Sequence, residues 1–177
     1  DGTRVSFAYE SVTFSYDGAS LKAVTSVRWP SGDRATYSYI DEGATCRFTD
    51  PRGEVTTLLY QINSGSPNLH TLIEPADQRH TYSWSSNQLT SYEDPLGNTT
   101  SYRYETYPID NRQRIRGVTT PSGGLYTYGY DMESVARVEY VIDELDHRCT
   151  VAWDASGRAI APHWVICDAL GKTFAGS

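Results

Sequence analysis

Apolar and polar residues alternate along the chain at fixed distances from a series of turns. In Asp94-Pro95-Leu96-Gly97, Asp stands first, Pro second and Gly fourth, which is typical of a type I turn. Beyond this turn Tyr102 and Tyr104 lie two residues apart, so in a strand they share one face. Tyr92 occupies a similar place before the turn. The pattern predicts a β-hairpin around residue 97.

The same spacing recurs along the whole chain. We call the last residue of each turn its anchor. The anchors are Gly2, Gly32, Gly53, Asp77, Gly97, Gly123, Asp146 and Gly171. Apolar residues or Tyr stand five positions before and five positions after the anchors, and a second turn lies midway between them. Each unit reads turn, strand, turn, strand, which predicts about seven consecutive β-hairpins.

An aromatic residue stands seven positions after each of the first seven anchors. These residues, the aromatic ladder, are Tyr9, Tyr39, Tyr60, Trp84, Tyr104, Tyr130 and Trp153. Ser or Thr stands four positions after the same anchors. The period of two predicts that the ladder lies on one face of a sheet and the Ser and Thr residues on the other. A single sheet gains stability from many weak cross-strand contacts, which large aromatic side chains provide.

The fold expected from this repeat is all-β: about seven consecutive hairpins of 20–30 residues in one continuous curved antiparallel sheet. Residues 1–177 are expected to form a single domain. The chain begins with neither Met nor a signal peptide, so we expect it to be a fragment of a larger protein. Strand edges that no further strand covers are predicted to pair with copies of the chain or with the rest of that protein.

Composition and charge narrow the classes of partner. The formal net charge is −7 and the pI is near 5.0, which argues against nucleic acid as a partner. The sequence has no run of 18 apolar residues that would span a membrane. Cys46, Cys149 and Cys167 match no zinc-binding spacing and are expected to be free thiols.

The repeat resembles the YD repeats of the Rhs family. "YDMESVARV" (130–138) and "WDASGRAIA" (153–161) are similar to the Tyr-Asp-x-x-Gly-Arg-Leu pattern of these repeats, and "DPRG" and "DPLG" match the Asp-Pro-x-Gly that closes each one. The resemblance implies a segment of a β-hairpin shell that encloses or scaffolds a C-terminal toxin or effector domain. It also implies a protein that is secreted or delivered by a bacterial secretion system; related barrels of animal teneurins serve adhesion. The surroundings of the family's self-cleaving Asp-Pro-x-Gly signature are absent, so protease activity is not expected.

No other pattern indicates catalysis, a metal or a cofactor. The histidines, His70, His80, His147 and His163, are scattered over different repeat positions. The acidic residues Glu139, Asp143, Glu144, Asp146 and Asp154 match no calcium-loop spacing, and the sequence has no Gly-x-Ser-x-Gly nucleophile elbow. Two interpretations of the ladder stay open. It is either a structural element of a non-enzymatic shell, or a face that binds glycans or a protein partner.

Overall fold

The computed structural model of the chain describes residues 4–13, 20–41, 44–63, 65–108, 110–130, 137–153, 158–167 and 173–175. At 152 and after 158 the description covers the backbone only. The chain divides into two compact units, Asp1–Asn98 and Thr99–Ser177, and each is described by itself.

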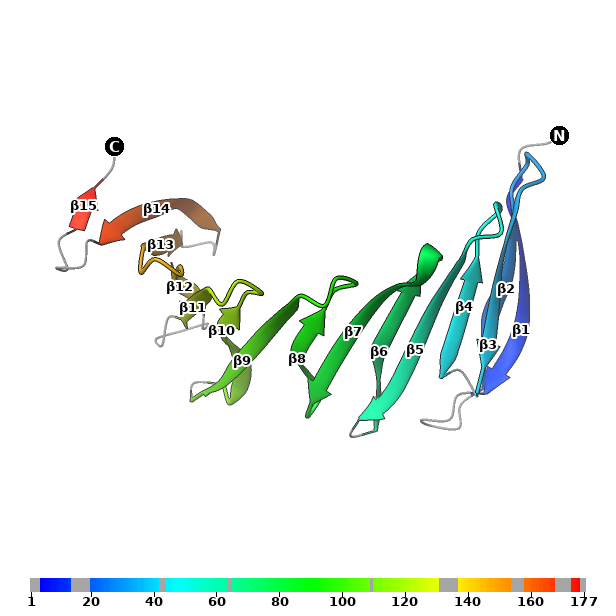
Figure 1. Cartoon of the computed structure of the whole chain (residues 1–177), viewed down its shortest axis with the longest axis horizontal. Helices are drawn as coiled ribbons and strands as arrows, with labels where there is room; N and C mark the ends of the chain where they lie inside the picture. Colours follow the sequence, from blue (N-terminus) through cyan, green and yellow to red (C-terminus); the bar gives the residue numbers. More distant parts are fainter. Residues whose placement is uncertain are drawn as a thin grey trace. The chain divides into compact units, whose positions relative to one another are not determined.

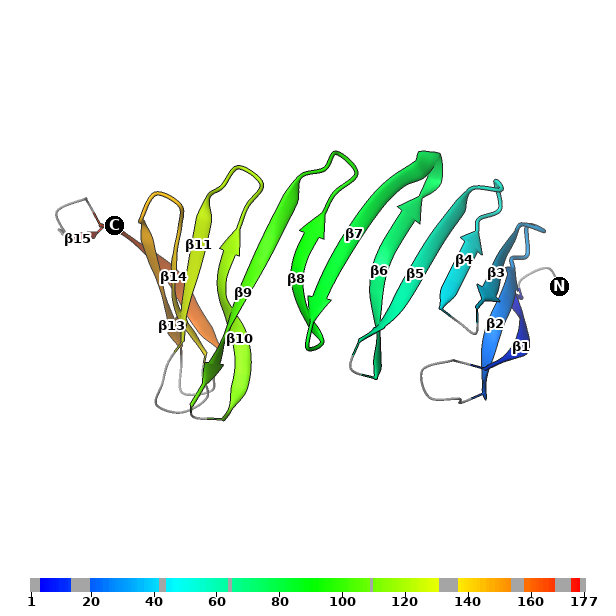
Figure 2. The same cartoon turned by 60° about the horizontal axis from the view of Figure 1, so that its bottom comes forward.

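The first unit contains eight strands in chain order, each antiparallel to the next (Figures 1 and 2). They are β1 (Ser6–Thr13), β2 (Ser20–Arg28), β3 (Arg34–Ile40), β4 (Thr45–Thr49), β5 (Val55–Asn63), β6 (Ser66–Glu74), β7 (Gln78–Ser85) and β8 (Gln88–Glu93). A single 3-10 turn, η1 (Pro75–Asp77), joins β6 to β7. Nearest neighbours along the chain are therefore also nearest neighbours in the sheet.

The second unit continues the same pattern with seven strands in chain order (Figure 2). They are β9 (Thr99–Tyr107), β10 (Arg112–Thr119), β11 (Leu125–Tyr130), β12 (Val138–Ile142), β13 (Arg148–Trp153), β14 (Ala159–Cys167) and β15 (Thr173–Ala175). The prediction of an all-β chain of consecutive antiparallel hairpins is confirmed. No helix in the described part of the chain is long and apolar enough to cross a membrane.

Five of the six anchor turns in the described part of the chain share one hydrogen-bonded geometry; the turn before Gln78, where Ala76 and Asp77 both have positive φ, differs. In the turn that ends at Gly97, the Gly97 N–H donates to the Asp94 carbonyl at 3.0 Å, and the Asp94 N–H donates to the Asn98 carbonyl at 3.0 Å. Gly97 has φ +81°, so the turn is a type I turn followed by a left-handed residue. The turns at 50–54 and 120–124 repeat these bonds. Asp146 takes the left-handed position of the turn at 143–147, with φ +62°.

This turn sets the register of the two strands that it joins. Phe48, five positions before the anchor Gly53, pairs with Thr56, three positions after it, and not with Leu58. Leu58 pairs instead with Cys46. The left-handed residue adds one position to the loop and shifts the pairing by two residues. A shift of two keeps every side chain on its predicted face.

A β-bulge lies in the second strand of six of the seven hairpins. One residue of that strand has no partner, and we call it the bulge residue. In five hairpins it lies opposite the step from the preceding residue to the ladder residue, and in β13–β14 it lies one step earlier, opposite Val151 and Ala152. The bulge residues are Thr25, His70, Thr90, Arg116, Glu139 and Ala161. The hairpin β3–β4 pairs without a bulge. Bulges leave backbone groups without ladder partners and turn nearby side chains.

The described chain has almost no closed core. Val12, Ala35, Tyr107 and Cys149 are its buried apolar residues, and no large side chain in this part is fully buried. The sheet has no second layer packed over it within either unit, so cross-strand contacts and hydrogen bonds must provide most of its stability. The anchors Gly2 and Gly171 lie outside the described residues, as do the mid-unit turns at 16–18 and 154–157. The single-domain assignment stays a prediction.

The left-handed anchor gives a first prediction. Gly97→Ala should lower the free energy of unfolding by about 1 kcal/mol or more, because a Cβ is unfavourable at positive φ. Gly97→Asn should cost less, since Asp146 adopts the same conformation in the equivalent turn. Urea denaturation followed by circular dichroism measures both. Equal stability of wild type and Gly97→Ala would contradict the turn assignment.

Candidate functional site

The ladder residues lie on one face within each unit. Residues that pair across neighbouring strands, such as Tyr37 with Phe48 and Phe48 with Thr56, point to the same face of the sheet, and every second residue along a strand stays on that face. The registers thereby place on one face of the first unit Tyr9, Tyr39, Tyr60 and Trp84. On one face of the second unit they place Tyr104, Tyr130 and Trp153. This placement agrees with the sequence pattern.

Four ladder residues donate a hydrogen bond to a backbone carbonyl 15 residues earlier. Tyr39 Oη donates to Val24 O at 3.1 Å, and Trp84 Nε1 donates to Leu69 O at 2.8 Å. Tyr130 Oη donates to Ile115 O at 2.8 Å, and Trp153 Nε1 donates to Val138 O at 2.8 Å. Each acceptor is the residue immediately before a bulge residue, in the hairpin that precedes the donor.

The bulge explains why these carbonyls accept a side-chain donor. An extra residue interrupts the regular ladder of backbone hydrogen bonds, and a carbonyl that is shielded from water requires another donor. A Tyr hydroxyl or a Trp indole reaches it from the adjacent strand of the next hairpin. Burial raises the pKa of Tyr39 and of Tyr130, which keeps each hydroxyl a donor. The ladder therefore ties each of these hairpins to the one before it.

The Asp of the anchor turn also has a structural role. Asp94 Oδ1 accepts the backbone N–H groups of Leu96 and Asn98, each at 2.9 Å. Asp50 and Asp143 accept the equivalent pair of N–H groups in their own turns. Hydrogen bonds from the Asn98 side chain and backbone lower the pKa of Asp94. These carboxylates hold turns and are not free for acid–base chemistry.

The histidines lie in separate local contacts. His80 Nδ1 is 2.7 Å from Tyr92 Oη and its Nε2 is 3.2 Å from Glu74 Oε2. His147 Nδ1 is 3.0 Å from Asp143 Oδ2, and His70 bonds its neighbour Thr71. Within the described residues no three His, Cys, Asp or Glu side chains converge as metal ligands.

The remaining candidates from the sequence are the cysteines and residues beyond the described side chains. Cys149 is buried and Cys46 is half-buried, and both are free thiols. Burial raises the pKa of the Cys46 thiol, so it is a poor nucleophile. The side chains of His163 and Cys167, and residue Asp154, lie outside the described part of the chain.

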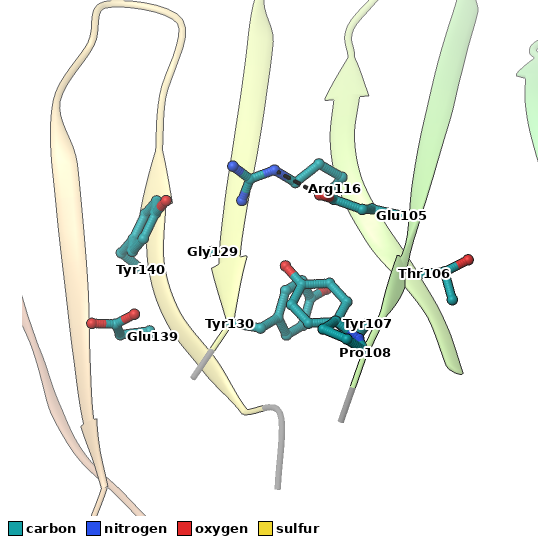
Figure 3. Close-up of a pocket in the computed structure, with 9 residues that line it drawn as sticks. All are labelled: Glu105, Thr106, Tyr107, Pro108, Arg116, Gly129, Tyr130, Glu139 and Tyr140. Carbon is teal, nitrogen blue, oxygen red and sulfur yellow. Dashed lines mark ion pairs between the residues drawn. The ribbon is translucent and has the colours of Figure 1, made fainter. Parts of the chain in front are cut away.

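A polar pocket of about 320 Å³ lies between β9, β10, β11 and β12 (Figure 3). It is lined by Glu105, Thr106, Tyr107, Pro108, Arg116, Gly129, Tyr130, Glu139 and Tyr140. Arg116 Nε is 3.3 Å from Glu105 Oε2, and Arg116 Nη1 donates to Tyr128 O at 2.5 Å. A hydrogen bond to the Tyr140 hydroxyl raises the pKa of Arg116. The guanidinium is thus fixed by contacts with neighbouring strands.

Aromatic rings form the other walls of this pocket. Tyr107, only 5% exposed, meets Tyr130 edge to face with 4.9 Å between ring centroids. The Arg114 guanidinium lies 5.3 Å from the Tyr107 ring centroid and pairs with Asp110. These contacts hold the Tyr107 ring between Tyr130 and Arg114.

Tyr140 completes the wall at the strand next to Tyr130. Its ring lies directly over Gly129, where a Cβ would approach to 2.1 Å. The Arg148 guanidinium lies 4.0 Å from the Tyr140 ring centroid. Only glycine at 129 leaves room for this packing.

The pocket was not predicted from the sequence. Arg116 and Glu139 belong to no short sequence pattern, and they face the pocket at bulges whose positions depend on strand pairing. Once the pairing is known, these two are the charged bulge residues of the described strands, whereas Thr25, His70, Thr90 and Ala161 occupy the other bulges.

Comparison of the chain with protein-family models and with curated protein sequences gives no match. The resemblance to Rhs/YD repeats therefore rests on the anchors, the turns and the ladder of this chain itself.

The ladder hydrogen bonds give a second prediction. Tyr130→Phe removes only the hydroxyl that donates to Ile115 O, and it should lower the free energy of unfolding by about 1 kcal/mol because the carbonyl loses its partner. Tyr9→Phe is the matched control, since Tyr9 is 58% exposed, and it should cost little. Urea denaturation measures both. Equal losses would rule out a specific role for the hydroxyl at 130.

The pair of Asp110 and Arg114 gives a prediction for pH. Hydrogen bonds from Arg114 lower the pKa of Asp110 to about 2, below the value of about 3.9 for an unfolded Asp. The carboxylate therefore stabilises the fold above about pH 4, and this contribution disappears as the pH falls towards 2. The difference in unfolding free energy between wild type and Asp110→Asn should shrink over this interval. A difference that stays constant would contradict the pairing.

Proposed function

We propose that the chain is a structural segment of an Rhs/YD-repeat shell that encloses or scaffolds a C-terminal toxin or effector domain. On this proposal the chain is not catalytic, and its host protein is secreted or delivered by a bacterial secretion system. The observation that carries the proposal is the hydrogen bond that a ladder side chain donates to the backbone carbonyl next to the bulge residue of the preceding hairpin. It recurs at a spacing of 15 residues in four hairpins.

This hydrogen bond suits an extended wall because it acts between successive hairpins. A structure made of stacked hairpins gains stability from each neighbour, so contacts that repeat once per unit extend the sheet at a constant energy per unit. The small buried core fits the same role, since a wall one sheet thick has little interior of its own.

The same contacts weigh against the ladder as a glycan-binding face. Trp84 and Trp153 use their indole N–H groups within the sheet, as Tyr39 and Tyr130 use their hydroxyls. These polar atoms are then not available to recognise sugar hydroxyls. The acidic turn residues Asp50, Asp94 and Asp143 are likewise engaged by backbone N–H groups, which supports a non-enzymatic role.

The shell proposal is tested on the complete polypeptide that contains this chain. We expect further hairpin units with an aromatic residue seven positions after each anchor, and an unrelated domain C-terminal to them. In the purified polypeptide that C-terminal domain should resist protease under conditions that digest it when it is expressed alone. Equal digestion of the enclosed and the isolated domain would contradict enclosure.

A further inference from the structure

Two arginines stand opposite each other beside the anchor turn that ends at Gly32. Arg28 is the last residue of β2, Arg34 is the first residue of β3, and the two are direct cross-strand partners. Side chains in such a pair have Cβ atoms about 4.5–5.5 Å apart, and like charges there destabilise a sheet. In the described strand registers no other two residues of like charge stand opposite each other. The stability of the sheet therefore does not explain this pair.

The other anchor turns show that this position does not require two arginines. Arg28 stands four positions before its anchor, and Arg34 stands two positions after it. The equivalent pairs at four other turns are Thr49 with Val55, Ile73 with Arg79, Thr119 with Leu125, and Ile142 with Arg148. None of these pairs contains two charged residues. The pair of arginines is therefore a local feature of the first described turn and not part of the repeat.

Both arginines line a pocket of about 410 Å³ on the face of the sheet opposite the ladder. Ser6 pairs with Arg28, and Ala8 pairs with Ser26, so these short side chains lie beside the arginines on the same face. Ser26 is only 8% exposed, whereas Arg28 and Arg34 are exposed. Two long cationic side chains thus stand next to a floor of short side chains, two of which carry hydroxyls.

The charges around this pocket favour an anion. Within the described residues neither Arg28 nor Arg34 has a carboxylate at ion-pair distance. Asp33, which precedes Arg34, accepts a hydrogen bond from Ser31 Oγ at 2.7 Å. No Asp or Glu is among the described residues that line the pocket. An anion between the two guanidinium groups would therefore replace their repulsion with two attractions.

We propose that Arg28 and Arg34 bind a phosphate group, either free inorganic phosphate or the phosphate of a small monoester. A phosphate monoester carries a charge of about −1.5 to −2 at pH 7 and three acceptor oxygens, which matches two guanidinium groups better than the single charge of a carboxylate. Each guanidinium can donate two parallel N–H groups to phosphate oxygens. The hydroxyls of Ser6 and Ser26 can donate as well. The inference is independent of the shell proposal, because it concerns one face of three strands.

The test is titration of the complete 177-residue chain in phosphate-free buffer, followed by calorimetry and by NMR of the arginine side-chain N–H groups. The probes are inorganic phosphate, glycerol 3-phosphate and acetate. We expect saturable binding of the two phosphates and weaker binding of acetate, and the order of the two phosphate affinities identifies the source of the group. The net charge of −7 opposes general attraction of anions, so saturable binding indicates a local site. Glycerol 3-phosphate should bind more weakly as the pH falls below about 6, where it loses its second charge.

Three variants locate the site. In Arg28→Gln and in Arg34→Gln the dissociation constant for phosphate should rise by about 10-fold or more, the loss expected for a charge-assisted hydrogen bond. Without ligand both variants should melt at or above the wild-type temperature, because the repulsion is removed. Arg79→Gln is the matched control: Arg79 is exposed and stands at the place equivalent to Arg34, but it faces Ile73 and lies outside the pocket. Its loss should leave phosphate affinity unchanged.

Several results would overturn the proposal. They are absence of saturable binding of both phosphates, acetate that binds as tightly as phosphate, and wild-type affinity in Arg28→Gln or Arg34→Gln. Equal weakening by Arg79→Gln would show general attraction to positive charge. A lower melting temperature of both ligand-free variants would show that the pair stabilises the sheet and is explained by folding. None of these results bears on the shell.

Discussion

The structure depends on a hydrogen bond between an aromatic side chain and a carbonyl beside a β-bulge. In a sheet one layer thick, backbone pairing and side-chain contacts between neighbouring strands provide nearly all the cohesion. The bulge leaves a carbonyl without a ladder partner, and the next hairpin supplies a Tyr hydroxyl or a Trp indole at a spacing of 15 residues. The bulge therefore frees a backbone carbonyl as an acceptor. The aromatic side chain of the next hairpin donates to this carbonyl and so joins the two hairpins.

The polar residues at the turns are also engaged in local hydrogen bonds. Residues such as Asp94 and Asp143, which in another context would suggest acid–base chemistry or a calcium site, accept two backbone N–H groups each. His147 bonds the Asp143 carboxylate of its own turn. These polar side chains are thus occupied locally. The pocket around Arg116 and Glu139 differs because these two residues are bulge residues of separate hairpins.

The sequence predicted which side chains share a face of the sheet, because side chains alternate along a strand, and it predicted the turns from the residues that favour them. The turn that ends at Gly97 and the shared face of Tyr104 and Tyr130 are examples. The sequence did not predict which residues pair across a turn, such as Phe48 with Thr56, because the left-handed anchor adds one position that spacing alone does not reveal. The bulge residues Arg116 and Glu139 were missed as well, since a bulge is defined by the partner strand. The pocket could not be predicted without that pairing.

Exchange of the tryptophan indole protons with deuterium, followed residue by residue by NMR, tests the account of the ladder most directly. Trp84 and Trp153 donate their indole N–H to Leu69 O and Val138 O, whereas Trp29 stands at the start of an anchor turn with 39% of its surface exposed. The account predicts that the indole protons of Trp84 and Trp153 exchange much more slowly than that of Trp29. Exchange of all three at the same fast rate would contradict it.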